Sequence, residues 1–126
     1  MKFYLASKYS DRLNICTVAF LLRQNGHDII AEWLRGENNG TDQPDFIRKG
    51  CAEVDLRDID SCEALVIFND VPESPGRNIE YGYALAKGKR LIVVGGGTSI
   101  FFQLAHERYK TREEFVRHYS GGGSIL

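Results

Sequence analysis

The sequence predicts an α/β fold: a Rossmann-like, doubly wound three-layer sandwich around a parallel sheet of four to five strands. Short apolar runs alternate with longer segments of helical periodicity, in the order βαβ(α)βαβα. The first strand, helix and strand fit into about 30 residues, which favours a parallel pair joined by a right-handed crossover. The chain has 126 residues, which suits one compact domain. We expect residues 1–119 to form that domain and residues 120–126 to be a flexible, glycine-rich tail.

The N-terminal third contains the first βαβ unit. Lys2–Ala6 is a short apolar run typical of a strand. Ser10 or Asp11 can cap the helix that follows, and its apolar residues recur at close to helical spacing. Gly26 suits the left-handed position that ends such a helix. His27–Trp33 is predicted to be the second strand.

The middle of the chain supplies a loop, a helix and the third strand. Residues 34–43 contain several glycines and asparagines, which predicts a loop that could gate a site. Pro44 stands where the first residue of the next helix is expected. Apolar periodicity predicts that helix over Asp45–Cys62, and Ala64–Phe68 is an apolar run that predicts a strand.

The last third repeats the alternation of strand and helix. Thr111 is the expected N-cap of a final helix, with Glu114 in the capping-box position three residues later. The elements before it follow in chain order: a loop over 69–77, a helix over 78–87, a strand over 91–94, a glycine break at 95–97 and a short irregular or helical piece over 100–106.

Composition excludes several classes of function. Hydrophobic residues make up 43% of the chain and charged residues 26%, and the net charge is -1. This balance argues against a surface that coats a nucleic acid polymer. No apolar stretch approaches the roughly 20 residues that span a bilayer, and the N-terminus lacks the layout of a signal peptide. We therefore expect a soluble, cytoplasmic protein with no membrane partner.

The cysteines and histidines do not form a metal-binding pattern. The three cysteines have no CxxC spacing, and the three histidines are far apart in the sequence. We expect reduced, mostly buried thiols and neither a metal site nor a cofactor. Gly95–Gly97 lacks the GxGxxG spacing and the acidic residue of a dinucleotide fingerprint.

Several polar residues are expected at one edge of the sheet. The carboxyl ends of parallel strands share an edge, and open α/β sheets bind ligands there. The residues expected at or near this edge come from all four predicted strand ends: Tyr4, Ser7, Trp33, Ser74, Gly76, Arg77 and Ser99. Trp33 could stack on a nucleobase or could be a packing residue.

Asp55 and Glu80 are a candidate pair of catalytic carboxylates. Two carboxyls that flank a glycosidic bond supply a nucleophile and an acid/base, and their proximity raises the pKa of one of them. The alternatives are structural: Asp55 lies in a charged helical run that could be solvated. Glu80 falls in the first turn of its predicted helix, where it could be an ordinary stabiliser. Ser74 and Arg77 could likewise form a helix cap or an anion site.

Three pieces of the chain carry a resemblance to a known family. They are Phe3–Ser7, Asp55–Leu56, and Gly76–Ala86 with Gly88–Lys89. Together they resemble the nucleoside 2-deoxyribosyltransferase family, including its 2'-deoxynucleoside 5'-phosphate N-hydrolase branch. The resemblance covers about residues 2–95, and the Glu-aromatic-Gly-Tyr-Ala-Leu-Ala piece that begins at Glu80 is its specific part.

The resemblance implies a mechanism and a ligand. Glu80 would attack C1' of the sugar, Asp55 would help to protonate the released base, and Tyr4 would hold the catalytic carboxylate. Water or a second base would then resolve the glycosyl-enzyme ester. The partner would be a small-molecule nucleotide or nucleoside, and the protein would be a homodimer or a higher homo-oligomer.

Position 74 bears on the substrate within this family. Transferases of free nucleosides carry Asp six residues before the nucleophile, whereas the monophosphate hydrolases carry Ser, as this chain does. Ser74, Arg77 and the helix N-terminus would attract a 5'-phosphate. Ser99 or Thr98 could add a hydroxyl across a dimer interface. The other residues expected to bind substrate are Ser7, Trp33, Gly76 and Asn78.

Two further hypotheses remain open from the sequence. A non-catalytic module on the same scaffold could sequester or sense a nucleotide, because a fold does not fix a function. A NAD-like or cyclic-nucleotide substrate could also be cleaved through Glu80. The combination of Tyr4, Asp55 and Glu80 favours an enzyme, since binding alone needs no nucleophilic carboxylate.

Overall fold

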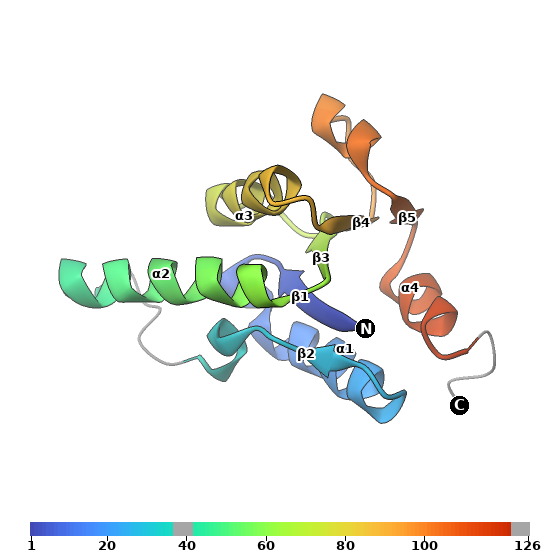
Figure 1. Cartoon of the computed structure of the whole chain (residues 1–126), viewed down its shortest axis with the longest axis horizontal. Coiled ribbons are helices and arrows are strands. Elements are labelled where there is room, and N and C mark those ends of the chain that lie inside the picture. Colours follow the sequence, from blue (N-terminus) through green and yellow to red (C-terminus); the bar gives the residue numbers. More distant parts are fainter. Residues whose placement is uncertain (37–41, 122–126) are drawn as a thin grey trace.

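The computed structural model describes residues 1–36 and 42–121 and has a five-stranded, all-parallel sheet in the order β2-β1-β3-β4-β5. The helices α1 and α4 pack on one face, and α2 and α3 pack on the other (Figure 1). This confirms the predicted doubly wound α/β fold. The strands are β1 (Lys2–Ala6), β2 (Asp28–Ile29), β3 (Ala64–Phe68), β4 (Arg90–Val94) and β5 (Glu107–Tyr109). The helices are α1 (Arg12–Gln24), α2 (Asp45–Ser61), α3 (Pro75–Ala86) and α4 (Arg112–His118), with 3-10 turns η1 (Tyr9–Asp11), η2 (Glu32–Arg35) and η3 (Ile100–Leu104).

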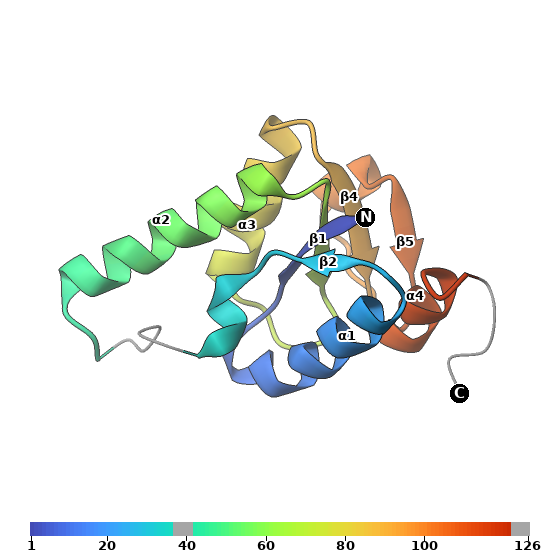
Figure 2. The same cartoon turned by 60° about the horizontal axis from the view of Figure 1, so that its bottom comes forward.

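The centre of the sheet explains where a ligand can bind. Every residue of β3 is buried, as expected for a strand covered by helices on both faces. The chain leaves β1 for β2 on one side and returns to β3 on the other, so the strand order reverses at β1. In open α/β sheets the crevice outside the carboxyl ends at such a reversal is the usual ligand site. The N-terminal half of α2 projects past the sheet on this side (Figure 2).

The second strand is shorter than predicted. β2 contains only Asp28 and Ile29. Directly after it, the Ile30 N–H donates one further hydrogen bond to β1, to the Phe3 carbonyl at 2.8 Å. The chain then turns into η2, where the buried indole of Trp33 donates a hydrogen bond to the Leu5 carbonyl at 2.9 Å. Insertion of this large side chain into the core ends the strand.

Two helix starts differ from the prediction. Pro44 is not the first helical residue of α2 but precedes it, in an extended conformation. α3 begins at Pro75, three residues before its predicted start, because proline has the φ of a first helical position and Ser74 before it is extended. Glu80 therefore lies in the second turn of α3, beyond the range in which the helix dipole would explain it.

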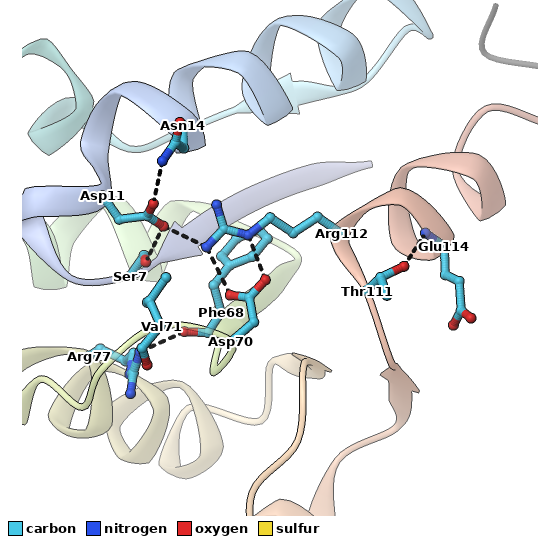
Figure 3. Close-up of polar contacts among 10 residues, drawn as sticks. All are labelled: Ser7, Asp11, Asn14, Phe68, Asp70, Val71, Arg77, Thr111, Arg112 and Glu114. Carbon is cyan, nitrogen blue, oxygen red and sulfur yellow. Dashed lines mark hydrogen bonds and ion pairs between the residues drawn. The ribbon is translucent and has the colours of Figure 1, made fainter.

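The C-terminal third holds one strand that was not predicted as such. β5 is short and polar and pairs with β4 as the edge of the sheet. The predicted cap is confirmed: the Thr111 hydroxyl accepts from the Glu114 N–H at 3.1 Å, as Figure 3 shows. The Glu114 carboxylate accepts from the Lys110 N–H. Of the predicted tail, residues 122–126 lie outside the described part of the chain, as do residues 37–41 of the predicted gating loop.

Among residues 1–36 and 42–121, no helix combines the length and apolar character needed to cross a bilayer. Cys62 is buried, whereas Cys16 and Cys51 are half-buried.

Gly95 fixes the loop after β3 against the end of β4. Its φ is +100°, and a Cβ there would lie 2.7 Å from the Asp70 backbone nitrogen. Gly95→Ala is expected to lower the free energy of unfolding by about 2 to 4 kcal/mol, because it adds backbone strain to a clash with rigid backbone atoms. Urea unfolding measures the change.

Gly96→Ala is the matched control for that experiment. A Cβ at Gly96 would meet no atom within 4 Å, so the change should stay within about 0.5 kcal/mol. Equal effects of the two substitutions would contradict the assignment of Gly95.

Candidate active site

Tyr4 and Glu80 form the centre of the candidate site. Tyr4 lies in β1 with its side chain fully buried, and its hydroxyl donates to Glu80 Oε2 at 2.7 Å. Glu80 reaches the tyrosine from α3, on the face of the sheet that α2 and α3 cover. A strand in the core and a helix above it thus position one hydrogen-bonded pair.

Asp55 of α2 completes a trio with Tyr4 and Glu80. The Asp55 carboxyl lies beside that of Glu80, and each affects the pKa of the other. Asp60, further along α2, braces the two helices: its Oδ1 accepts from the Tyr83 hydroxyl and its carbonyl from Lys89 Nζ, each at 2.8 Å. The structure therefore brings together the three residues that the sequence analysis singled out as catalytic.

The environment of the trio changes how its members titrate. Burial raises the pKa of Glu80, and the neighbouring Asp55 carboxyl raises it further. Burial also raises the pKa of Asp55, with a contribution from the charge of Asp58. Burial and the charge of Glu80 hold the pKa of Tyr4 well above its usual value. Two neighbouring carboxyls resist simultaneous ionisation, so the raised pKa of Glu80 favours one proton on the pair at neutral pH.

This arrangement can supply both groups that glycosidic chemistry needs. The pKa of Glu80 is raised more than that of Asp55, so the reactive form is the one in which the proton has moved to Asp55. Glu80 is then an anion held by the Tyr4 hydroxyl, and Asp55 is an acid. One carboxylate can attack while the other protonates the leaving group.

Ser74 stands at the N-terminus of α3 as predicted, but its side chain does not cap the helix. Within the described residues its hydroxyl has no hydrogen-bond partner. Gly76 lies in the first turn beside it, and the Asn78 side chain donates to Glu73 Oε1 at 3.0 Å. The first turn of α3 thus presents backbone N–H groups without a side-chain acceptor, which suits an anion.

The Arg77 guanidinium, which was expected to contact a phosphate, forms hydrogen bonds with the loop before α3. The side chain is 1% exposed. Its two terminal nitrogens donate to the Phe68 carbonyl at 2.7 Å and to Asn69 Oδ1 at 3.2 Å. Carbonyls at the end of β3 need donors, and Arg77 supplies them. These bonds hold the loop that precedes α3. Arg77 also contributes to the lining of a cavity of about 780 Å3.

Three other predicted residues form their hydrogen bonds with groups outside the trio. Ser7 is buried and donates to Asp11 Oδ2 at 3.0 Å. Trp33 is 7% exposed, so the structure places it in the packing role that was the alternative to base stacking. Ser99 caps η3 and lines a cavity of about 780 Å3 between α3 and η3, which the trio does not line.

Sequence reasoning missed a partly buried ion cluster at the same edge of the sheet (Figure 3). Arg112, in the first turn of α4, donates to Asp11 Oδ2 at 2.6 Å and to Asp70 Oδ2 at 2.7 Å. Its guanidinium also lies 5.1 Å from the centre of the Phe68 ring. The cluster ties α4 to the segments that follow β1 and β3. The one local signal was a cation in the first turn of a helix, where the dipole disfavours it.

Arg112→Met is expected to lower the free energy of unfolding by about 2 to 4 kcal/mol at pH 7, because it leaves the buried Asp11 carboxylate without its cation. Burial alone would raise the pKa of Asp11, but hydrogen bonds from Arg112, Asn14 and Ser7 lower it overall. A lowered carboxyl pKa stabilises the fold above the unfolded value of about 4, and this contribution is lost as the pH falls. The deficit of the variant should therefore shrink below pH of about 4.

Arg35→Met is the control for Arg112→Met. Arg35 is 67% exposed and pairs with Glu32 at 3.4 Å, so its loss should cost less than about 0.5 kcal/mol. Chemical denaturation across the pH range measures both variants. A pH-independent deficit in Arg112→Met would contradict the electrostatic role of the cluster.

Comparisons with known proteins identify the fold. No protein-family model matches the chain, and no curated protein matches it either. A CMP N-glycosidase of Clostridium botulinum is similar over 94% of this chain and 97% of its own, with 22% identity and a TM-score of 0.68. A 2-deoxyribosyltransferase of Bacillus psychrosaccharolyticus is similar over 92% and 90%, with 17% identity and a TM-score of 0.77. A 2-deoxyribosyltransferase of Leishmania mexicana is similar over 82% and 69%, with 19% identity and a TM-score of 0.56. The chain shares the fold of these three proteins over most of its length.

Proposed function

We propose that this protein is an enzyme of the nucleoside 2-deoxyribosyltransferase type, which cleaves the N-glycosidic bond of a (deoxy)nucleoside 5'-monophosphate or nucleoside. The observation that carries the proposal is the trio beside the point where the strand order reverses. In it, the Tyr4 hydroxyl donates to Glu80 and the Asp55 carboxyl lies beside Glu80. The shared fold supports it, because the similar structures are named as an N-glycosidase and as deoxyribosyltransferases.

The proposed reaction has two steps through a covalent intermediate. The Glu80 carboxylate attacks C1' of the sugar, and the bond from C1' to the base nitrogen breaks as Asp55 gives its proton to the departing base. The Tyr4 hydroxyl holds the attacking carboxylate in place. Asp55, now a base, then takes a proton from water, whose oxygen attacks C1' and releases Glu80. A second nucleobase in place of water would make the reaction a transfer.

A 5'-phosphate is the proposed anchor of the substrate. The Ser74 hydroxyl and the uncapped first turn of α3 offer donors to an anion. The C. botulinum structure is named for a nucleotide, CMP, which supports this choice. The anchor does not require Arg77, whose guanidinium bonds within the preceding loop.

Ser74→Asp should raise the KM for a nucleoside 5'-monophosphate by at least about tenfold, because a carboxylate repels phosphate. The KM for the matching nucleoside should change little. Steady-state base release measures both values, and Ser74→Ala separates the loss of the hydroxyl from the added charge. Equal changes for nucleotide and nucleoside would refute the phosphate anchor.

Base release from a substrate panel tests the function itself. Deoxyribonucleosides, ribonucleosides and the 5'-monophosphates of both are incubated with the protein, with and without a second free base. Release from monophosphates without an acceptor base indicates a hydrolase, and exchange only with an added base indicates a transferase. No release from any substrate, while a nucleotide still raises the melting temperature, would favour a binding module instead.

We further propose that the active protein is a homodimer or a higher homo-oligomer. Four large apolar side chains of α3 and η3 are more than half exposed: Ile79, Ile100, Phe101 and Leu104. A second copy covering this face would bury them and would bring a second Ser99 close to α3. Light scattering on the purified protein tests this proposal, and a monomer at micromolar concentration would contradict it.

A further inference from the structure

We infer that Asp58 is a positioning residue for the proposed glycosidic reaction: it fastens η2 to α2 and directs a fixed negative charge at the catalytic pair. The inference rests on the proposed function and adds a residue that neither the sequence motifs nor the trio contains.

Asp58 lies on the same face of α2 as the proposed acid. It follows Asp55 by three residues, and side chains three positions apart are neighbours on a helix surface. Its Oδ2 accepts a hydrogen bond from the backbone N–H of Glu32 at 2.8 Å. Glu32 is the first residue of η2, so this bond fixes the start of that turn against α2.

The same turn supports the strand that carries Tyr4. Trp33 follows Glu32, and its indole N–H donates to the Leu5 carbonyl at 2.9 Å. Leu5 is the neighbour of Tyr4 in β1. Asp58 therefore connects α2, which holds Asp55, with the strand that holds Tyr4.

Within residues 1–36 and 42–121, no basic group forms an ion pair with Asp58. Asp58 lines a cavity between α1, η2 and α2. The basic residues in the described lining of this cavity are Arg23 of α1 and Arg35 of η2. Neither forms an ion pair with Asp58, and Arg35 pairs with Glu32 instead.

The negative charge of Asp58 acts on two members of the trio, Asp55 and Tyr4. Its charge contributes to the raised pKa of Asp55 and to that of Tyr4. The other titratable groups that face Asp55 are Glu80 from α3 and Tyr4 from β1. Asp58 thus favours the protonated form of Asp55, which is the form that can donate to a leaving base.

The pH–rate profile of base release tests this role. Asp58→Asn keeps an oxygen that can accept from the Glu32 N–H but removes the charge. The acid form of Asp55 should then be lost at lower pH, so the alkaline limb should move to lower pH by about 0.5 to 1 unit. Asp58→Glu keeps the charge and should retain the wild-type limb, which distinguishes the charge from the packing of the side chain.

Glu53→Gln is the matched control, since it removes one exposed carboxylate from the same helix. Its profile should superimpose on that of the wild type. A profile of Asp58→Asn that also superimposes on the wild type would overturn the inference, whether or not the variant is less stable.

A titration that needs no turnover separates this inference from the proposed function. Carbon-13 NMR of the aspartate carboxyl groups follows Asp55 in the wild type and in Asp58→Asn. A lower pKa of Asp55 in the variant supports the inference even where no substrate is cleaved. An unchanged Asp55 titration overturns it even where the enzyme is active.

Discussion

Glu80→Gln is expected to reduce base release by at least about 10³-fold while the fold remains intact, because the amide cannot form the glycosyl ester. Glutamine has nearly the same shape and keeps an oxygen that can accept from the Tyr4 hydroxyl. The measurement is single-turnover base release from the best substrate of the panel. Mass spectrometry of the denatured enzyme should show a covalent sugar adduct in the wild type and none in the variant.

The same substitution should change the pH dependence of stability. Burial raises the pKa of Glu80, so the folded state favours the protonated form of this side chain. This stabilisation is present below the unfolded carboxyl pKa of about 4.3 and is lost as the pH rises through the folded value. Glutamine mimics the protonated form and cannot ionise. The variant should therefore match the wild type near pH of about 4 and exceed it by about 1 to 3 kcal/mol at pH of about 9.

Urea unfolding at both pH values measures this difference, and Glu53→Gln serves as the exposed control. A folded Glu80→Gln protein with wild-type turnover would remove Glu80 from the reaction. A stability difference that does not vary with pH would show that the pKa of Glu80 is the same in the folded and unfolded states.

Asp55→Asn is expected to slow base release by about 10²- to 10⁴-fold for an ordinary base, because no acid remains to protonate the leaving nitrogen. A 7-methylguanine nucleotide should largely escape this loss. Its base is already cationic while attached to the sugar and departs as a neutral molecule without an added proton. The first-turnover burst of 7-methylguanine should stay within about tenfold of the wild type.

The burst is the correct readout because Asp55 also activates water in the second step. Slow hydrolysis of the ester would mask an intact first step in steady-state rates. Glu53→Gln should behave as the wild type on both substrates. Equal losses of Asp55→Asn on the ordinary and the methylated base would contradict its role as the acid.

The parts of the fold that could be predicted are those with a strong local signal. The apolar runs of β1, β3 and β4 lie in the middle of the sheet, where burial on both faces demands continuous hydrophobic residues. The edge strands have weaker signals. β2 is cut short where Trp33 enters the core, and β5 is polar because it pairs on one side only.

Side-chain partners were harder to predict than elements. Glu80, Asp55 and Tyr4 could be singled out because they lie in the three short pieces of sequence that carry the family resemblance. The hydrogen-bond partners of Arg77 could not be predicted, since a guanidinium in the first turn of a helix can bind an anion or loop carbonyls equally well. Asp11 and Arg112 are 101 positions apart, and no periodicity connects such distant residues.

Because Asp11 and Arg112 are so far apart in the sequence, this ion cluster forms late during synthesis of the chain. Asp11 and Asp70 leave the ribosome well before Arg112. Until α4 emerges, the carboxylates that follow β1 and β3 lack the cation that they share. Nascent and truncated chains without α4 should therefore hold these two segments only loosely.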